Sequence, residues 1–362
     1  MDDEHLADYM AEATERLIGR VRHLALHDPA EMRFLMRFAM AEKKAARTRH
    51  EHEDAGRHIP GFLIASITSS CNLHCRGCYA RAEGICGRSE RSELTADEWC
   101  GIFEQASDLG ISFCILAGGE PLMRSDLLRS AASNRGMVFP VFTNGTMLDG
   151  EFSDMFADNR NLIPVFSLEG MQGSTDARRG LGTFSKVMSS MREADRRHLF
   201  FGASVTVTAA NLKEVTDHAF QDMLAAAGCG IVFFIEYVPT GGGADMALGK
   251  EGRDMLAARV QDCRYRYPDT VFMSFPSDEV RFGGCIGAGR GFFHINPYGD
   301  AEACPASPYS DMNLRDYRLV EVLSSPLFKQ IRSAGLLHGE AIGGCILHER
   351  EHEVRTLVHL DP

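Results

Sequence analysis

The sequence lacks three features that would assign it to a membrane, secreted or nucleic-acid-binding class. No stretch of its 362 residues is apolar for long enough to cross a bilayer. The chain begins Met1-Asp2-Asp3-Glu4, without the basic region and apolar segment of a secretory signal. Basic residues are also fewer than acidic ones. The chain has 38 Lys and Arg and 50 Asp and Glu, which gives a formal net charge of −12. These absences predict a cytoplasmic protein that has no membrane span and does not bind nucleic acid non-specifically.

Cysteine, by contrast, is not scarce, because the chain has 11. The cytosol keeps thiols reduced, so these cysteines are expected to bind metal rather than to form disulfides. Cys71, Cys75 and Cys78 lie in one short loop, with three and then two residues between them. This spacing lets one backbone turn aim three thiolates at a single centre, and thiolates select zinc, copper(I) or iron-sulfur clusters.

The cysteine loop directly follows a predicted strand. Residues 62–68 are apolar and β-branched, which is typical of a buried strand. The loop therefore lies at a strand's carboxyl end, where barrels and open α/β sheets carry their active sites. A closed tetrahedral zinc site would need a fourth Cys or His ligand, and His74 or Cys86 could supply one. A structural zinc site is thus the alternative to an open metal centre.

The run Cys71-Asn72-Leu73-His74-Cys75-Arg76-Gly77-Cys78 after the first strand resembles the hallmark of the radical S-adenosylmethionine (SAM) enzymes. The resemblance implies that the three thiolates hold three irons of a 4Fe-4S cluster. The amino and carboxylate groups of SAM then bind the fourth iron. One departure is Gly77, which stands where the family often has an aromatic residue. This departure affects packing against the adenine of SAM and not cluster binding.

Strand and helix patterns alternate from residue 62 to residue 237. The predicted strands are 62–68, 112–117, 138–143, 162–167, 200–207 and 231–237. A capping box at Thr95 and Glu98 begins one of the intervening helices, with Leu94 and Trp99 as a hydrophobic staple, and Asn211 and Glu214 repeat the cap pairing. Such an order predicts a parallel sheet covered by helices. Six units match the partial (β/α)6 barrel of TIM type that the resemblance implies.

The rest of the chain is predicted to flank this barrel. Apolar residues at helical spacing up to Leu24, followed by the helix start Asp28-Pro29, predict an N-terminal helical extension. We interpret the histidine-rich run 50–54 as a solvated helix end, since alternate positions of a helix face different ways. The predicted parts are the helical extension at 1–58, the barrel at 59–246, a connecting helix and strand at 247–275, and a small α+β domain at 276–362.

Polar residues follow several of the predicted strands. Gly118 and Gly119 allow close backbone approach, and the Glu120 carboxylate can accept an ammonium group. The resemblance implies that this triplet binds the SAM amino group. It also implies that Ser167 and Glu169 lie beside SAM. Ordinary turn chemistry, or an exposed loop charge for the arginine, is the alternative for the later residues. The candidate SAM-binding residues are Gly118, Gly119, Glu120, Asn144, Ser167, Glu169 and Arg179.

A second cysteine set lies near the C-terminus. A predicted hairpin around residues 292–300 lets Cys285 and Cys304 come close, and Cys345 with His348 forms a Cys-x-x-His pair. The set resembles the twitch domain, a shortened SPASM domain, and implies one auxiliary 4Fe-4S cluster. Twitch domains usually close with Cys-x-x-Cys, whereas His348 ends the pair here. We expect the three cysteines as ligands with His348 as the fourth, and a zinc ion on the same four residues is the alternative.

The resemblance implies an oxygen-sensitive oxidoreductase. Reductive cleavage of SAM would give methionine and a 5′-deoxyadenosyl radical, which abstracts a substrate hydrogen. The expected substrate is a small polar metabolite or cofactor precursor, and the expected electron donor is of flavodoxin or ferredoxin type. The alternatives are a SPASM-type peptide or protein maturase and a non-catalytic iron-sulfur or zinc protein. Glu236, Tyr237 and His294 lie where an acid or base could act, but each is as easily structural, so no catalytic residue is assigned.

Overall fold

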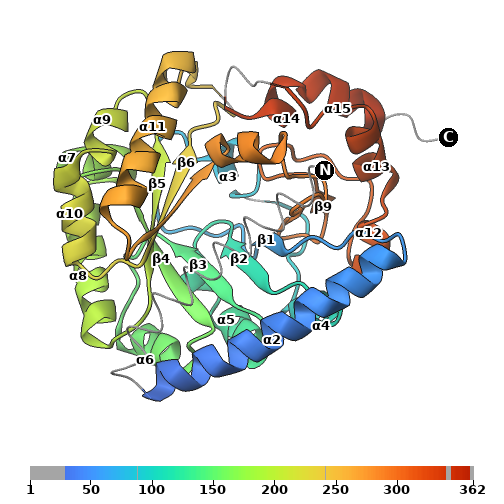
Figure 1. The fold of residues 1–362 in the computed structure, drawn as a ribbon, viewed down its shortest axis with the longest axis horizontal. Coiled ribbons are helices and arrows are strands. Elements are labelled where there is room, and N and C mark those ends of the chain that lie inside the picture. The colour runs from blue at the N-terminus through green and yellow to red at the C-terminus, as the bar shows by residue number, and fades with distance from the viewer. Residues whose placement is uncertain (1–28, 88, 241, 340–343, 359–362) are drawn as a thin grey trace.

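The computed structural model describes residues 29–87, 89–240, 242–339 and 344–358. A sheet of nine strands, in the order β7-β6-β5-β4-β3-β2-β1-β8-β9, forms its centre and curls into a half-barrel (Figure 1). Strands β1 to β7 are parallel neighbours in chain order. The strands are β1 (Phe62–Ser66), β2 (Phe113–Ala117), β3 (Phe139–Thr143), β4 (Leu162–Leu168), β5 (Gly202–Val207), β6 (Ile231–Glu236), β7 (Val271–Phe275), β8 (His294–Ile295) and β9 (Ala301–Glu302). The predicted partial barrel is confirmed.

Helices cover the outer side of the sheet, while α2 crosses its lower edge and α12 to α15 gather beside β8 and β9 (Figure 1). The described α-helices are α2 (Pro29–Asp54), α3 (Tyr79–Ala82), α4 (Ala96–Asp108), α5 (Ser125–Ser133), α6 (Gly150–Asp158), α7 (Gln172–Arg179), α8 (Thr183–Arg196), α9 (Leu212–Val215), α10 (His218–Ala226), α11 (Lys250–Arg266), α12 (Leu319–Val322), α13 (Pro326–Ser333), α14 (Ile346–Glu349) and α15 (Glu351–Val358). Short 3₁₀ turns are η1 (Pro121–Met123), η2 (Ala244–Met246) and η3 (Ser277–Phe282). In the described ranges, no helix is both long and apolar enough to cross a membrane.

The two predicted helix caps have different outcomes. The capping box of α4 is confirmed, because Thr95 Oγ1 accepts the Glu98 amide at 3.2 Å and the Glu98 carboxylate accepts the Thr95 amide at 2.7 Å. The pairing predicted for α9 is wrong. Asn211 instead donates its side-chain amide to the Glu169 carbonyl at 2.9 Å, and the Glu214 carboxylate binds the loop after β4. Buried carbonyls at the strand ends need donors, and satisfying them outweighs a local cap.

The sheet is larger than the six strand-helix units predicted from the sequence. Helix α11 and strand β7 continue the alternation, and β8 then pairs in parallel with β1, with His294 opposite Ile64. The amide of Ile64 donates to the Phe293 carbonyl at 3.1 Å. Without β8, strand β1 would leave a row of unpaired backbone groups at the edge. The C-terminal hairpin is therefore part of the barrel's sheet.

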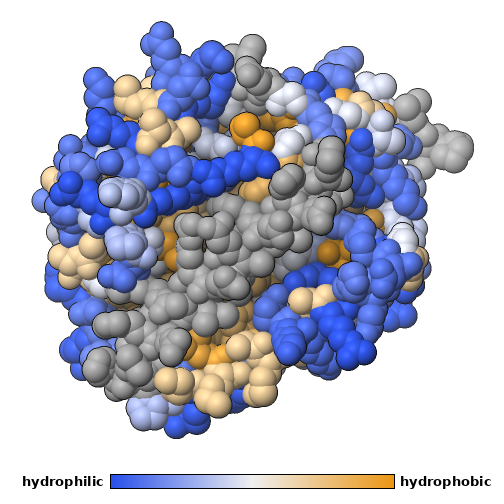
Figure 2. Space-filling view, in the orientation of Figure 1, coloured by the Kyte–Doolittle hydropathy of each residue, from blue (hydrophilic) through white to orange (hydrophobic). Residues whose placement is uncertain are grey.

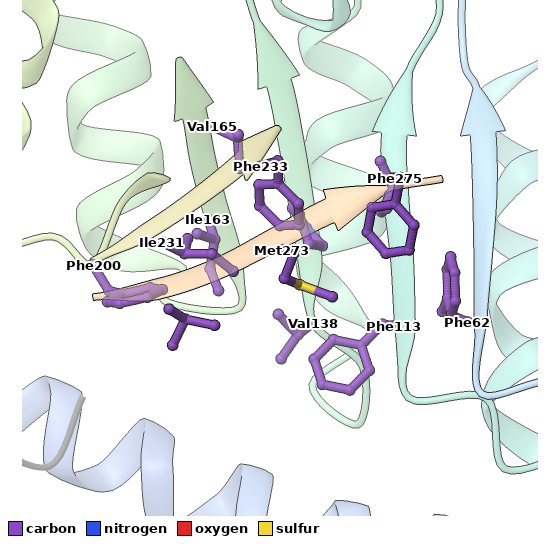
Figure 3. A pocket seen from close by; sticks show the side chains of 13 residues that line it. Phe62, Phe113, Val138, Ile163, Val165, Phe200, Ile231, Phe233, Met273 and Phe275 are labelled. Atoms are coloured by element: carbon purple, nitrogen blue, oxygen red, sulfur yellow. The ribbon is translucent and has the colours of Figure 1, made fainter. Parts of the chain in front are cut away.

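Helix α2 packs under the amino ends of the strands. Its Leu35 and Phe38 are buried in an apolar cluster with side chains from β4, β6 and β7. Phe113, Val138 and Met273 are among the side chains that line an apolar cavity of about 100 Å³ above the helix (Figure 3). Hydrophilic residues cover most of the periphery of the face seen in Figure 2. The first helix predicted for the extension lies outside the described residues, and the run 50–54 forms the end of α2, mostly facing solvent as predicted.

Candidate functional site

The backbone after β2 holds the cysteine loop that follows β1. The amide of Gly119 donates to the Thr68 carbonyl and that of Glu120 to the Ser70 carbonyl, each at 2.8 Å. A Cβ atom on Gly119 would lie 2.0 Å from the Ser70 oxygen, and one on Gly118 would lie 2.6 Å from the Thr68 oxygen. Real Cβ atoms do not approach backbone so closely, so both positions require glycine. The Gly-Gly-Glu turn thus shapes the cysteine loop directly.

The three loop cysteines are half-buried at the carboxyl end of β1. Burial raises the pKa of the Cys71 thiol above its usual value. Burial also raises the pKa of Cys75, although Arg179 and Arg178 act in the opposite direction. A protonated thiol is a poor ligand, and a bound cation converts it to the thiolate. The thiols are accessible enough to receive such a cation.

Cys86 packs against the loop and is buried, in contact with Cys71 and Cys78. Burial, and then the neighbouring loop thiols, raises the pKa of Cys86 to about 12, so its thiol is neutral at physiological pH. His74 is exposed. Among the described residues, no group of three or more His, Cys, Asp or Glu side chains is close enough to hold a single metal ion.

Glu120 joins the ends of β2 and β3 at the same edge of the sheet. Its buried carboxylate accepts hydrogen bonds from the Leu122 amide, the Thr143 hydroxyl and the Asn144 amide, at 3.0, 2.7 and 2.8 Å. Burial nevertheless raises the pKa of Glu120. The side chain of Asn144 donates to Asn72 in the cysteine loop at 2.7 Å. An ionised carboxylate has about four acceptor positions, so Glu120 can take one further donor.

Glu169 follows β4 and binds two arginines of α7. Its Oε1 atom accepts from Arg178 at 2.7 Å and from the Arg179 Nη2 atom at 2.6 Å, while its buried Oε2 atom has no hydrogen-bond partner among the described residues. Burial alone would lower the pKa of Arg179, but Glu169 and Cys75 raise it above its usual value. Ser167 is half-buried near the end of β4. The predicted Glu169 and Arg179 thus lie together, facing the cysteine loop.

The second cysteine set is also brought together. The thiol of Cys304 donates to the Cys345 sulfur, and Cys285 lies within electrostatic reach of both. Cys345 is the N-cap residue of α14, so its sulfur lies near the amides of Leu347 and His348 in the first turn of that helix. The Cys304 hydrogen bond, assisted by these amides, lowers the pKa of Cys345 against the effect of burial. The His348 imidazole is half-buried.

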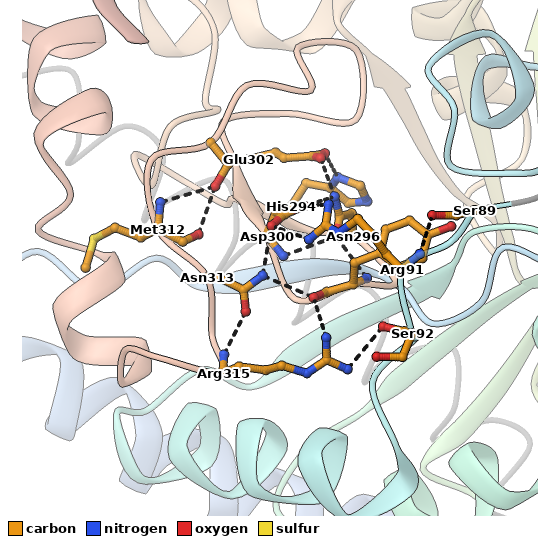
Figure 4. A network of polar contacts seen from close by, with 12 residues as sticks. Ser89, Arg91, Ser92, His294, Asn296, Asp300, Glu302, Met312, Asn313 and Arg315 are labelled. Carbon is orange, nitrogen blue, oxygen red and sulfur yellow. Dashed lines mark hydrogen bonds and ion pairs between the residues drawn. The ribbon is translucent and has the colours of Figure 1, made fainter. Parts of the chain in front are cut away.

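Tyr79 lies between the two cysteine sets. Burial, then Cys78, and more weakly Cys304, raises the pKa of its hydroxyl, while the Ser66 side chain acts in the opposite direction. Ser66 in turn binds the fully buried His294 at 2.8 Å, and the other ring nitrogen of His294 binds Glu302 at 2.7 Å (Figure 4). This chain of contacts connects the end of β1 to the β8–β9 hairpin that carries Cys304.

The three acid-base candidates from the sequence are buried. Both ring nitrogens of His294 are occupied, as described above. Glu236 accepts a hydrogen bond from Ser277, and burial raises the pKa of this carboxyl. The Tyr237 hydroxyl donates to the Gly242 carbonyl at 2.9 Å.

Sequence reasoning missed the parts played by Arg178, Tyr79 and Ser66. Only the Arg-Arg pair at the end of α7 offered a local signal, since the other contacts join distant segments.

Residues 65–227 match the family model described as the radical SAM superfamily. The chain therefore contains a radical SAM domain over these residues. The match runs from β1, through the cysteine loop and the Gly-Gly-Glu turn, to the end of α10. A domain of this kind implies a 4Fe-4S cluster and SAM. The residues present fit these groups, because three accessible thiols lie beside Glu120, which has an acceptor position left, and beside the unpartnered Glu169 Oε2 atom.

The chain is similar to several known proteins. It is 25% identical to the AdoMet-dependent heme synthase of Methanosarcina barkeri over 312 residues, which cover 78% of this chain and 88% of the relative. It is 27% identical to the Fe-coproporphyrin III synthase of the same organism over 187 residues, but these cover only 51% of this chain and 46% of the relative. The chain therefore spans about half the length of the second relative.

Solved structures share the fold. The structure of Streptococcus suis SuiB bound to the precursor peptide SuiA has a TM-score of 0.65 and 17% sequence identity, and it covers 80% of this chain and 71% of SuiB. At this identity the likeness shows the fold alone. The coverage extends well beyond the 163 residues between positions 65 and 227, so the likeness takes in parts of the chain outside the family match.

Proposed function

We propose that this chain cleaves SAM reductively and uses the 5′-deoxyadenosyl radical to abstract a hydrogen atom from a small polar cofactor precursor. An auxiliary iron-sulfur cluster at the second cysteine set assists the reaction. The observation that carries the proposal is the placement of two thiol sets on either side of Tyr79, beside two buried carboxylates at the carboxyl edge of the sheet. The bound cluster supplies the electron that breaks the carbon-sulfur bond of SAM.

The chain's own residues bind and orient SAM in this proposal. Glu120 accepts the ammonium group in its remaining acceptor position. Glu169 offers its Oε2 atom to a further donor, and Arg179, which uses two N–H groups on Glu169, has others for the SAM carboxylate. The glycines at 118 and 119 keep the cysteine loop close enough for these contacts.

The proposed nature of the substrate is supported by the AdoMet-dependent heme synthase of Methanosarcina barkeri. The match to this relative covers 88% of the relative's length. A cofactor precursor is therefore favoured over a peptide. Similarity to the Bacillus subtilis sporulation killing factor maturation protein covers 52% of that relative, and it keeps the peptide maturase as the second candidate.

The test is anaerobic incubation of the iron-loaded protein with SAM and dithionite. We expect release of 5′-deoxyadenosine from the wild type and none from Cys75→Ala. Cys100→Ala, which removes a half-buried thiol on α4, is the matched control and should release as much as the wild type. A cluster-loaded wild type that releases no 5′-deoxyadenosine would overturn the proposal in favour of a non-catalytic iron-sulfur protein.

A further inference from the structure

A buried thiol that the proposed function does not use lies beside the cysteine loop. Cys86 is only 6% exposed, and it packs in a small cluster with Cys71, Cys78 and Tyr79. Cys71 and Cys78 are half-buried, so solvent reaches the loop thiols but not Cys86. An accessible thiol beside a protected one is the arrangement in which an oxidised cysteine is captured by its neighbour.

Local backbone structure brings Cys86 back to the loop. The amide of Ala82 donates to the Cys78 carbonyl at 3.1 Å and closes the single turn of α3. The Cys86 amide then donates to the Ala80 carbonyl at 2.5 Å, so the chain folds back on that turn. Only seven residues lie between Cys78 and Cys86. The contact between the two cysteines is therefore held by short-range hydrogen bonds.

The surroundings of Cys86 single out Cys78 among the loop thiols. Burial is the largest cause that raises the pKa of Cys86, and Cys78 and then Cys71 follow. Arg81 acts in the opposite direction, and its guanidinium donates to the Leu73 carbonyl inside the loop at 2.8 Å. Cys78 is thus both the loop thiol nearest to Cys86 in the sequence and the one that acts on it most strongly.

We propose that Cys86 is a resolving cysteine, which captures Cys78 as a disulfide when a hydroperoxide oxidises the iron-free loop. First, hydrogen peroxide transfers one oxygen atom to the Cys78 thiol, which gives a sulfenic acid and one water. The Cys86 sulfur then attacks the sulfenic sulfur, and the S–S bond forms. The hydroxyl group leaves with the Cys86 proton as a second water. The two thiols lose two electrons and two protons, and the peroxide takes them up.

The disulfide protects the loop while it holds no iron. A sulfenic acid that meets no thiol is oxidised further to a sulfinic acid, which thiol reductants do not reverse. A thiol reductant does reverse a disulfide, and Cys78 then returns to the form that can bind iron. The inference goes beyond the proposed function, because neither step needs SAM, iron or substrate.

Trypsin makes the disulfide directly measurable, because it cleaves after arginine and places the thiols on separate peptides. The three peptides are 58–76 with Cys71 and Cys75, 77–81 with Cys78, and 82–88 with Cys86. The iron-free full chain is treated with hydrogen peroxide, blocked with N-ethylmaleimide, digested and analysed by mass spectrometry. We expect peptide 77–81 linked to peptide 82–88 in the wild type, and dithiothreitol should separate the two.

A variant pair tests the protective role. Cys86→Ser removes the resolving thiol, and Cys100→Ser, which changes a half-buried thiol on α4, is the matched control. After peroxide and then dithiothreitol, sulfinic acid on peptide 77–81 should be at least about threefold more abundant in Cys86→Ser than in the wild type. Cys100→Ser should match the wild type. The Tm of each untreated variant shows whether it has folded.

Two results would overturn the inference. One is a wild type in which peptide 77–81 is linked to peptide 58–76 instead of 82–88, because the loop thiols then pair with one another. The other is equal sulfinic acid on peptide 77–81 in folded Cys86→Ser and in the wild type. Failure of the proposed function is seen separately, in the release of 5′-deoxyadenosine, since the peptide analysis does not depend on SAM cleavage.

Discussion

Replacing Gly119 by alanine should displace the cysteine loop. The new Cβ atom would lie 2.0 Å from the Ser70 oxygen and 2.6 Å from its carbonyl carbon. Both are backbone atoms, so no side-chain rotation relieves the clash. The two loops must separate, and the hydrogen bond from the Glu120 amide to the Ser70 carbonyl, now 2.8 Å long, weakens with them. The displacement reaches Cys71, the next residue in the loop.

The magnitude follows from these two contacts. Forcing extra volume into packed structure costs about 1–3 kcal/mol. The weakened hydrogen bond adds about 1 kcal/mol, a total of about 2–4 kcal/mol. For a chain of 362 residues the unfolding entropy is about 0.8 kcal/mol/K, so the Tm should fall by about 3–5 °C. The iron bound at the cysteine loop should fall as well.

Scanning calorimetry and iron analysis of Gly119→Ala test this reasoning. Gly101→Ala, on helix α4, is the control, because no atom lies within 4 Å of its new Cβ. Alanine in a helix is favoured over glycine by up to about 1 kcal/mol, so the control should be as stable as the wild type or slightly more stable. A Gly119→Ala protein with unchanged Tm and full iron content would refute the account of the loop.

Three further predictions concern other contacts. The hydrogen bond from Arg315, followed by that from the Thr95 amide, lowers the pKa of Glu98 to about 2 from 4.5. The stability from this carboxylate is present above about pH 4.5 and is lost toward pH 2, so the Tm of Glu98→Gln should fall less than that of the wild type between pH 5 and pH 3. His294→Ala leaves a buried carboxylate without its partner and should lower the unfolding free energy in urea by about 2–4 kcal/mol. Arg179→Lys loses the forked contact with Glu169 and should raise the KM for SAM about tenfold.

Each of these variants has a control on the surface. Asp158→Asn should leave the acid dependence of the Tm as in the wild type, His352→Ala should leave the urea midpoint unchanged, and Arg192→Lys should leave the KM unchanged, since all three residues are exposed. Equal acid dependence in Glu98→Gln and the wild type would contradict the first prediction. A shift below about 0.5 kcal/mol would contradict the second. An unchanged KM would contradict the third.

Local patterns predicted much of the fold. Runs of apolar residues located β1 to β6 to within one or two residues, because buried parallel strands are apolar on both faces. The capping box at Thr95 could also be predicted, because its two residues are only three positions apart in the sequence. The pairing of β8 with β1 was not predicted, since strands of two residues leave little periodic signal and their partner is 230 positions away, as for His294 and Ile64. Strand β8 pairs with β1 because it covers an edge of β1 that would otherwise stay unpaired, and a local pattern does not show this.

The candidate site shows the same division. The cysteine spacing and the Gly-Gly-Glu turn carry their information in consecutive residues. The structure brings the predicted Glu120, Asn144, Glu169 and Arg179 to one edge of the sheet, while their contact with SAM stays a prediction. Tyr79 and the Ser66–His294–Glu302 contacts could not be predicted, because each joins segments that are distant in the chain.

Iron and sulfide analysis of the anaerobically reconstituted protein tests the central claim most directly. Two clusters predict about eight irons for each wild-type chain. Removing Cys71, Cys75 and Cys78 by alanine substitution should leave about four, and so should removing Cys285, Cys304 and Cys345. An iron content that stays equal to the wild type after either triple substitution would contradict the assignment of a cluster to that cysteine set.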